Sequence, residues 1–324
     1  MREPPAERRA IIIDTDPGVD DAIAILLALA SPELELLGLT TVLGNVSLAL
    51  ASDNARRVCE LAGRPDVPIF AGAARPLAGP PIAAEPSHGS GGLGGATLPR
   101  PTMALAAGDA VDWLVDTLMR RAPGTVTVAA LAPLTNLAEA MVREPRIASR
   151  LGDVVVMGGA FGTGNCTGGA EFNFYADAEA AHRVLASGCR LTLVPLDLTH
   201  QALATPARMA ALAAVAPPIG PAVAAMLRHY SDAALPFGLA GGALHDACVV
   251  AYLLQPGLFS GRPAHVTVET GAARVGVTVE DRRPVAAAAP NCVVLARLDA
   301  DGFFRLLTER LARLSAPPES DRGR

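Results

Sequence analysis

The chain has 324 residues, of which 51% are hydrophobic, and this length suffices for one large core or for two domains. The net charge is −5 and no basic patch is present, which disfavours binding to nucleic acid through phosphate neutralisation. All 27 basic residues are arginines, and the absence of lysine excludes both a Schiff-base lysine and a P-loop lysine.

The predicted elements begin with a buried strand, the apolar run at residues 11–13. Pro17 and Gly18 predict the turn that ends this strand, and the apolar residues that follow, up to Ala30, have helical spacing. Four aspartates belong to this unit: Asp14, Asp16, Asp20 and Asp21. They lie between the carboxyl end of a strand and the start of a helix, which is where open α/β sheets bind their ligands.

Strands and helices alternate through most of the remaining chain. The predicted strands are residues 34–42, 67–70, 126–131, 153–157 and 191–196, and the predicted helices are residues 48–62, 108–121, from about 136, 177–186 and 247–254. This alternation predicts an α/β protein with a mostly parallel open sheet and helices on both faces. Near the end of the chain, residues 265–269 and 274–279 predict a β-hairpin with a four-residue loop.

Two segments interrupt the alternation and are interpreted as lids. Residues 78–101 are rich in glycine and proline, and residues 217–242 combine a helix with a Pro/Gly-rich end. The polar tail at residues 316–324 is predicted to be disordered. Because neither an internal repeat nor a linker is visible, we expect one domain over residues 1–324, with its core at about residues 10–312.

The sequence also favours a cytoplasmic protein without a membrane partner. No apolar segment reaches the ~20 residues of a membrane span, and the polar start of the chain does not resemble a signal peptide. The cysteines are scattered and form no CxxC motif, which fits reduced thiols better than a disulfide framework: Cys59, Cys166, Cys189, Cys248 and Cys292.

The four clustered aspartates indicate a metal site, because closely packed anions are costly unless a cation neutralises them. An all-oxygen cluster favours a hard divalent ion such as Ca²⁺ or Mg²⁺. The alternative is helix capping, since acids at a helix start complement the helix dipole and bind free N–H groups. Asp14 fits a purely structural role best, because it ends the strand.

Further candidate residues follow other predicted strands, so we expect their side chains to converge on one crevice. These residues are Asn45, Leu131, Asn165, Glu171, Asn173 and the pair His245-Asp246. Each also has a simpler interpretation. Asn45 and Asn173 suit turns, the pair suits a helix cap, and His88, in the glycine-rich segment, suits an exposed loop.

A nine-residue pattern, Asp-x-Asp-Pro-Gly-x-Asp-Asp-Ala, occupies residues 14–22. Further motifs follow at residues 40–45, 132–138, 156–159, 170–173, 197–200 and 243–246. In these motifs and their order the sequence resembles the inosine–uridine-preferring nucleoside hydrolase family, over about residues 10–312. The resemblance implies a Rossmann-like nucleoside hydrolase fold and assembly into a homodimer or homotetramer.

The resemblance further implies Ca²⁺-dependent hydrolysis of the N-glycosidic bond of ribonucleosides to ribose and free base. The implied metal ligands are Asp16, Asp21, Asp246 and the backbone carbonyl of Leu131. Asp16 would also act as general base on a Ca²⁺-bound water, and His245 would protonate the departing base or donate a hydrogen bond to it.

The implied substrate-binding residues form two groups. The ribose would be held by Asp20, Asn45, Asn165, Glu171 and Asn173, with Met157 beneath it. His88 and Tyr230 would contact the base or close the site. The second lid contains Tyr230 but no second tyrosine, so the base preference stays open, and His245 favours a branch that is not restricted to purines.

Two other functions match part of the pattern. A phosphatase of the haloacid dehalogenase type also begins with a strand and Asp-x-Asp, but it needs a lysine, which this chain lacks. The second alternative is a nucleoside- or Ca²⁺-binding protein of the same fold that has lost its chemistry. Intact Asp16 and His245 argue against that loss.

Overall fold

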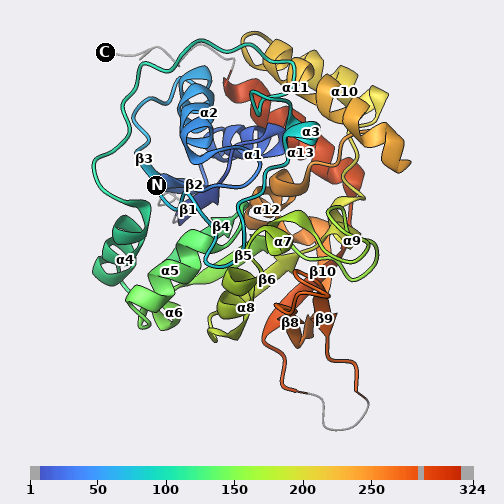
Figure 1. Ribbon diagram of the computed structural model, residues 1–324. Helices are drawn as coiled ribbons and strands as arrows, with labels where there is room; N and C mark the ends of the chain where they lie inside the picture. Colours follow the sequence, from blue (N-terminus) through green and yellow to red (C-terminus); the bar gives the residue numbers. More distant parts are fainter. Residues whose placement is uncertain (1–7, 284–287, 315–324) are drawn as a thin grey trace, which may run out of the picture.

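The computed structural model describes residues 8–283 and 288–314, and the expected disordered tail from residue 316 lies outside the described residues (Figure 1). The strands are β1 (Arg9–Thr15), β2 (Leu34–Thr41), β3 (Ile69–Ala71), β4 (Val126–Ala130), β5 (Asp153–Met157), β6 (Leu191–Val194), β7 (Phe259–Ala264), β8 (Val266–Val268), β9 (Thr278–Glu280) and β10 (Cys292–Leu298). Eight of them form one sheet in the order β3-β2-β1-β4-β5-β6-β10-β7. All neighbours in this sheet are parallel except β10 and β7.

Helices connect the parallel strands and cover both faces of the sheet (Figure 1). They are α1 (Val19–Leu29), α2 (Leu48–Leu61), α3 (Glu85–His88), α4 (Ala110–Arg120), α5 (Thr135–Arg143), α6 (Ile147–Arg150), α7 (Phe172–Ala176), α8 (Ala178–Ala186), α9 (Leu196–Thr199), α10 (Pro206–Ala213), α11 (Ile219–Ala234), α12 (His245–Leu254) and α13 (Ala300–Leu314). The predicted α/β class, with a mostly parallel open sheet, is therefore confirmed.

The side chains of the strands point alternately to the two faces of the sheet and contribute to a hydrophobic core on each face. Ile11 and Ile13 of β1 pack with α1, α2, α11, α12 and α13 on one face. Ile12 points to the other face, toward α4, α5 and α8. All three isoleucines are fully buried, as expected for a strand in the middle of a sheet that is covered on both sides.

The strand order places a topological switch point between β1 and β4. From β1 the chain builds outward through β2 to β3, and it then returns to add β4, β5 and β6 on the other side of β1. In such sheets the helices on the two sides diverge at the switch point and leave a crevice at the carboxyl ends of the strands. Asp16 follows β1 and Leu131 follows β4, so both lie at this crevice.

The C-terminal part of the chain contains the main differences from expectation. The predicted hairpin exists as β8 and β9, but its strands are shorter than predicted and Val268 pairs with Thr278. The prediction of a four-residue loop was therefore wrong. Residues 269–277 lie between the strands. Glu269 and Val277 are still hydrogen-bonded there, and the Arg274 N–H donates to the Gly271 carbonyl to form a turn.

The sequence analysis also left out β7, β10 and α13, which complete the sheet and one of the cores. β3 and β7 form the two edges of the sheet. In the part of the chain that the structure describes, no helix is both long and apolar enough to cross a membrane.

Gly158 sets a packing constraint at the carboxyl end of β5. A Cβ at this position would lie 2.4 Å from Cε1 of Phe174, which is fully buried. We expect Gly158→Ala to lower the free energy of unfolding by about 1–3 kcal/mol, because the rigid ring has no space to retreat. Gly257→Ala is the matched control, because no atom lies within 4 Å of a Cβ there. Equal urea midpoints for the two variants would contradict this packing argument.

Candidate active site

The acidic turn between β1 and α1 is held together by Asp21. One carboxylate oxygen of Asp21 accepts hydrogen bonds from the Thr15 hydroxyl, at 2.6 Å, and from the Asp16 backbone, at 3.3 Å. The other oxygen accepts from the Gly18 backbone N–H, at 2.9 Å. Asp21 thus closes the turn from the first turn of α1, where the helix dipole favours a negative charge.

Asp16 is fully buried and bonded to the segment that follows β2. The backbone N–H of Asn45 donates to Oδ2 of Asp16 at 2.5 Å. The Asn45 amide donates to Oδ2 of Asp21 at 3.0 Å, so one asparagine connects both carboxylates. Burial, followed by the charge of Asp21, raises the pKa of Asp16 well above its ordinary value.

Three carboxylates form the densest part of the cluster. Oxygens of Asp20, Asp21 and Asp246 lie within 4.8 Å of one another, and all three residues are buried. Asp246 lies in the first turn of α12, which packs against α1. Burial and the neighbouring Asp21 charge raise the pKa of Asp20 to about 8. Burial and the Asp20 charge raise the pKa of Asp246 well above its ordinary value.

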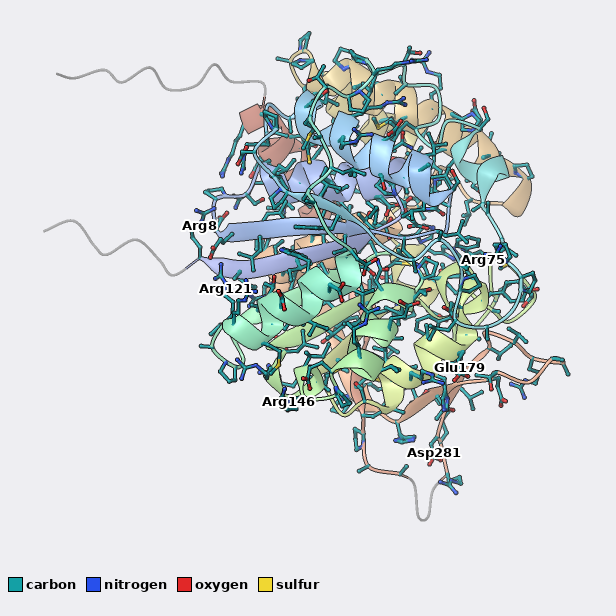
Figure 2. All side chains as sticks on the ribbon, turned by 60° about the vertical axis from the view of Figure 1, so that its left-hand side comes forward. Arg8, Arg75, Arg121, Arg146, Glu179 and Asp281 are labelled. Carbon is teal, nitrogen blue, oxygen red and sulfur yellow. The ribbon has the colours of Figure 1, made fainter. Side chains whose placement is uncertain are left out.

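Arginine does not supply the missing positive charge. Among the described residues, none of the ion pairs involves Asp16, Asp21 or Asp246. Arg121 and Arg146, like the other labelled arginines, lie at the periphery (Figure 2).

Asp14 is separate from this cluster in its contacts. Its Oδ1 accepts hydrogen bonds from the Thr40 hydroxyl, at 2.6 Å, and from the Asn136 amide, at 2.8 Å. Its backbone carbonyl accepts from the Leu131 N–H. Burial raises the pKa of Asp14 to about 6 in spite of these hydrogen bonds. The contacts agree with the predicted supporting role of Asp14, which joins β1 to β2 and α5.

The residues expected on the ribose side meet at the ends of β4 and β5. The Asn173 amide donates to the Leu131 carbonyl, at 2.8 Å, and to the Met157 carbonyl, at 3.1 Å. Glu171 caps α7 and also accepts from the Gly159 N–H, so both of its carboxylate oxygens are bonded to backbone. Burial raises the pKa of Glu171 to about 7.

Asn165, one of the predicted site residues, is hydrogen-bonded within its own loop. Its side chain is exposed, and its amide oxygen accepts from the Phe172 N–H at 2.9 Å. The hydrogen bond closes the loop before α7. Asn165 thus differs from Asn45 and Asn173, whose amides connect separate strand ends.

The residues expected to contact the base, His88 and Tyr230, lie beside the acidic turn. His88 is 5% exposed, so the reading of this residue as an exposed loop histidine was wrong. Its Nδ1 accepts from the Val19 N–H at 3.1 Å and lies 4.0 Å from the Asp20 carboxylate. Burial lowers the pKa of His88 to about 4. The rings of His88 and Tyr230 lie 5.2 Å apart.

His245 begins α12 and is partly exposed. Its Nδ1 lies 2.7 Å from the Thr199 hydroxyl, and its ring lies 5.7 Å from that of His200. Removal of the ring from bulk water, together with His200, lowers the pKa of His245 to about 3. The sequence analysis gave neither Thr199 nor His200 a role, although both follow a strand, as the other candidates do.

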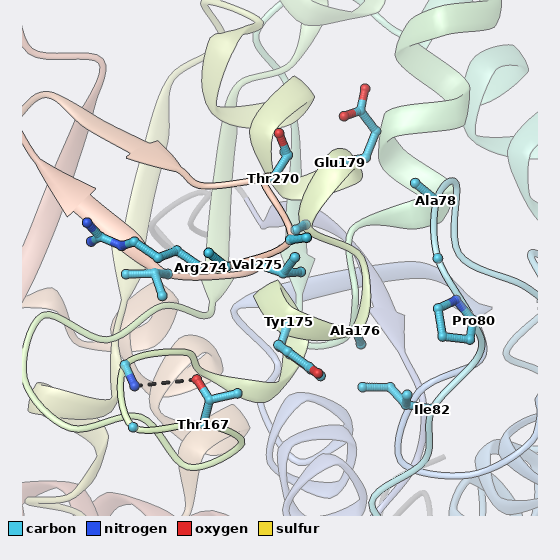
Figure 3. Close-up of a pocket in the computed structure, with 17 residues that line it drawn as sticks. Ala78, Pro80, Ile82, Thr167, Tyr175, Ala176, Glu179, Thr270, Arg274 and Val275 are labelled. Carbon is cyan, nitrogen blue, oxygen red and sulfur yellow. Dashed lines mark hydrogen bonds between the residues drawn. The ribbon is translucent and has the colours of Figure 1, made fainter.

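A cavity of about 760 Å³ lies elsewhere on the surface. Its walls come from residues 78–82, 167–169, α7, α8 and the segment between β8 and β9 (Figure 3). Tyr175 of α7 faces Ile82 across it (Figure 3). None of the predicted site residues lines this cavity, so it is separate from the acidic cluster.

A mostly parallel sheet with a buried carboxylate cluster at its switch point places the molecule among the doubly wound α/β proteins, which bind their ligands at this position. The chain belongs to the inosine-uridine preferring nucleoside hydrolase family, whose model matches residues 11–305. It is therefore a ribonucleoside hydrolase family enzyme, in the N-glycosidase class.

Relatives and solved structures match nearly the whole chain. An uncharacterized protein of Schizosaccharomyces pombe is 46% identical, with 94% of this chain and 99% of the relative covered. The pyrimidine-specific ribonucleoside hydrolase RihA of Salmonella agona is 40% identical, with 93% of this chain and 97% of the relative covered.

Among solved structures, a plant nucleoside hydrolase is 32% identical, with a TM-score of 0.87, and 95% of this chain and 99% of that chain are covered. A purine-preferring ribonucleoside hydrolase from Gardnerella vaginalis is 29% identical, with a TM-score of 0.88, and 94% of this chain and 99% of that chain are covered.

Gly44 allows Asp16 to take its position, because a Cβ at residue 44 would lie 1.8 Å from Oδ2 of Asp16. We expect Gly44→Ala to lower the free energy of unfolding by about 1–3 kcal/mol, since the Asp16 carboxylate must leave its hydrogen bond to Asn45.

In an Asp16→Ala background the loss caused by Gly44→Ala should shrink, because the two closest conflicting atoms belong to the Asp16 carboxylate and only Cδ of Pro133, at 2.9 Å, remains. Gly168→Ala serves as the control, since its Cβ would meet no atom within 4 Å. Chemical denaturation of the four variants and the wild type checks the double-mutant cycle. An unchanged loss in the Asp16→Ala background would disprove the conflict.

Proposed function

We propose that the protein hydrolyses the N-glycosidic bond of ribonucleosides with the help of Ca²⁺, releasing ribose and a free base. The observation that carries the proposal is the buried triad of carboxylates, Asp20, Asp21 and Asp246, beside Asp16. Family membership supplies the reaction class. The site geometry supports the division of roles described below.

The donor set suits a hard divalent cation. Every candidate ligand is an oxygen, the carboxylates are buried, and their mutual repulsion opposes ionisation. Ca²⁺ takes about six to eight oxygen ligands in flexible geometry. Asp16, Asp21, Asp246 and the Leu131 carbonyl are the proposed ligands. Asp20, which has an oxygen within 4.8 Å of oxygens of Asp21 and Asp246, is proposed to bind the sugar.

When bound, the cation would supply a positive charge that lowers the pKa of water and attracts sugar hydroxyls. Asp16 is the proposed general base, which accepts a proton as water attacks C1′ of the ribose. The hydrogen bond from the Asn45 N–H orients the Asp16 carboxylate for this step. Cleavage passes through an oxocarbenium-like state at the sugar, which nearby carboxylates stabilise.

The remaining residues would bind the two halves of the nucleoside. Asp20, Asn45, Asn165, Glu171 and Asn173 are proposed for the ribose, above Met157. Asp20 lies in the first turn of α1, and Asn45, Glu171 and Asn173 lie around the ends of β2, β4 and β5, which supports this assignment. Asn165 is exposed and lacks this support. His88, Tyr230 and His245 are proposed for the base side, and His245 would donate a hydrogen bond to the departing base.

We also propose that residues 1–324 contain one domain that acts in the cytoplasm as a homodimer or homotetramer. The family match over residues 11–305 supports one domain. Five free thiols support a reducing compartment. Light scattering on purified protein would measure the mass of the assembly directly.

Asp16→Asn tests the general base. We expect kcat for uridine, cytidine and inosine to fall by about 10²–10⁴-fold, because an amide does not accept the proton from water. Release of reducing sugar is the measurement. Asp116→Asn is the control, since Asp116 is an exposed partner of Arg120, and its rates should stay at the wild-type level. A wild-type protein that binds nucleosides without releasing ribose would instead support the alternative of a binding protein.

Calcium affinity is expected to rise with pH. In the absence of a cation, burial and Asp21 raise the pKa of Asp20 to about 8, so its carboxyl is largely protonated at lower pH. Binding favours the ionised form and releases protons. Calorimetry between pH 6 and pH 8 should show an affinity that increases by up to about tenfold per pH unit for each proton released.

Chelation should abolish hydrolysis, and added Ca²⁺ should restore it and raise the melting temperature. Asp20→Asn should flatten the pH dependence of the affinity, while Asp116→Asn should leave it as in the wild type. An affinity that does not change with pH would contradict the raised pKa values.

A further inference from the structure

His245 has a buried hydrogen-bond partner to which the proposed function gives no role. The Thr199 hydroxyl lies 2.7 Å from Nδ1 of His245. Thr199 is fully buried at the last position of α9. Within residues 8–283 and 288–314, the side chain that hydrogen-bonds to the His245 ring is that of Thr199. The contact therefore influences which ring nitrogen of His245 carries the proton.

Backbone pairing holds the two residues together. Leu203 and Ala243 form an antiparallel bridge between the segment after α9 and the segment before α12. The Leu244 N–H donates to the Ala202 carbonyl at 3.0 Å, next to the start of α12. The position of His245 against Thr199 is thus built into the main chain and does not depend on a mobile side chain.

The distances indicate which atom donates. The Thr199 hydroxyl has one proton and two acceptor candidates, Nδ1 of His245 at 2.7 Å and the Leu196 carbonyl at 3.5 Å. The Leu196 carbonyl lies at the limit of hydrogen-bond distance, so Nδ1 of His245 is the better acceptor for the hydroxyl proton. A neutral imidazole that accepts a hydrogen bond at Nδ1 carries its own proton on Nε2.

We propose that Thr199 is a positioning residue, which donates to Nδ1 of His245 and so keeps the Nε2 proton available as the donor to the departing base. The inference rests on the proposed function. The His200 ring, 5.7 Å away and inclined by 60°, packs beside the imidazole and limits its rotation.

The chemical advantage is that a neutral ring donates without first taking up a proton. When the N-glycosidic bond breaks, its electron pair moves onto the base, and a hydrogen bond from Nε2–H stabilises that charge. Without the hydroxyl, the tautomer with its proton on Nδ1 becomes comparably populated. This tautomer presents the lone pair of Nε2, rather than a proton, to the base. The effect should therefore depend on how much help the leaving group needs.

Thr199→Val keeps the size of the side chain and removes the donor. We expect kcat for uridine and inosine to fall by about 10- to 100-fold, within the range of acid–base assistance, with KM changed by less than about threefold. Hydrolysis of 4-nitrophenyl β-D-ribofuranoside should keep its rate within about threefold, because nitrophenolate leaves as a stable anion. Thr199→Ser should restore nucleoside hydrolysis.

Thr308→Val is the matched control. The Thr308 hydroxyl donates to the Phe304 carbonyl at 2.8 Å, so this variant likewise removes a hydroxyl donor, but in α13, away from the proposed site. Its rates on both substrates should equal those of the wild type. If Thr199→Val slows both substrates equally, its role is structural, and if it slows neither, the proposal is wrong.

The ¹⁵N chemical shifts of the His245 ring provide a readout without turnover. The wild type should show a protonated Nε2 and an unprotonated Nδ1, and Thr199→Val should show a mixture of tautomers. A wild-type ring protonated on Nδ1 would overturn the proposal. Failure of the proposed function is distinguishable, because the wild type would then hydrolyse neither substrate while the spectrum still reports the tautomer.

Discussion

The surrounding structure depends on one constraint: the negative charge that is concentrated where β1 ends and α1 begins must be stabilised. Asp16, Asp20, Asp21 and Asp246 share a buried volume, and the pKa values of Asp16, Asp20 and Asp246 are raised by burial and by their neighbours. Each unpaired charge would cost several kcal/mol in such surroundings. The fold offsets part of this cost with backbone N–H groups and with the positive end of α1.

Three asparagines distribute this support across the sheet. Asn45 connects Asp16 to Asp21. Asn136 donates to Asp14 and to the Thr41 carbonyl, and its oxygen accepts from the Ala73 N–H. Asn173 links the carbonyls after β4 and at the end of β5. An amide carries donors and an acceptor without net charge, so it joins strand ends without adding to the electrostatic repulsion.

The sequence was sufficient to predict the parallel sheet, because apolar runs and helical spacing are local signals. It also located the acidic turn, which lies within one short segment. It did not predict β7, β10 and α13, since β10 enters the sheet beside β6, which lies about a hundred residues earlier in the chain. His88 was open to two readings for the same reason, because its burial depends on contact with Val19 and Tyr230. Thr199 lies in the motif at residues 197–200, but its partner His245 is more than forty residues away, so the contact is visible only in the structure.

The two edge strands limit how copies of the chain can associate. β3 has only three residues, and β7 contains Pro263, which lacks the N–H needed to donate to another strand. Both features suppress the growth of a continuous sheet from one molecule to the next. The sheet is thus protected against edge-to-edge pairing with the sheet of another molecule.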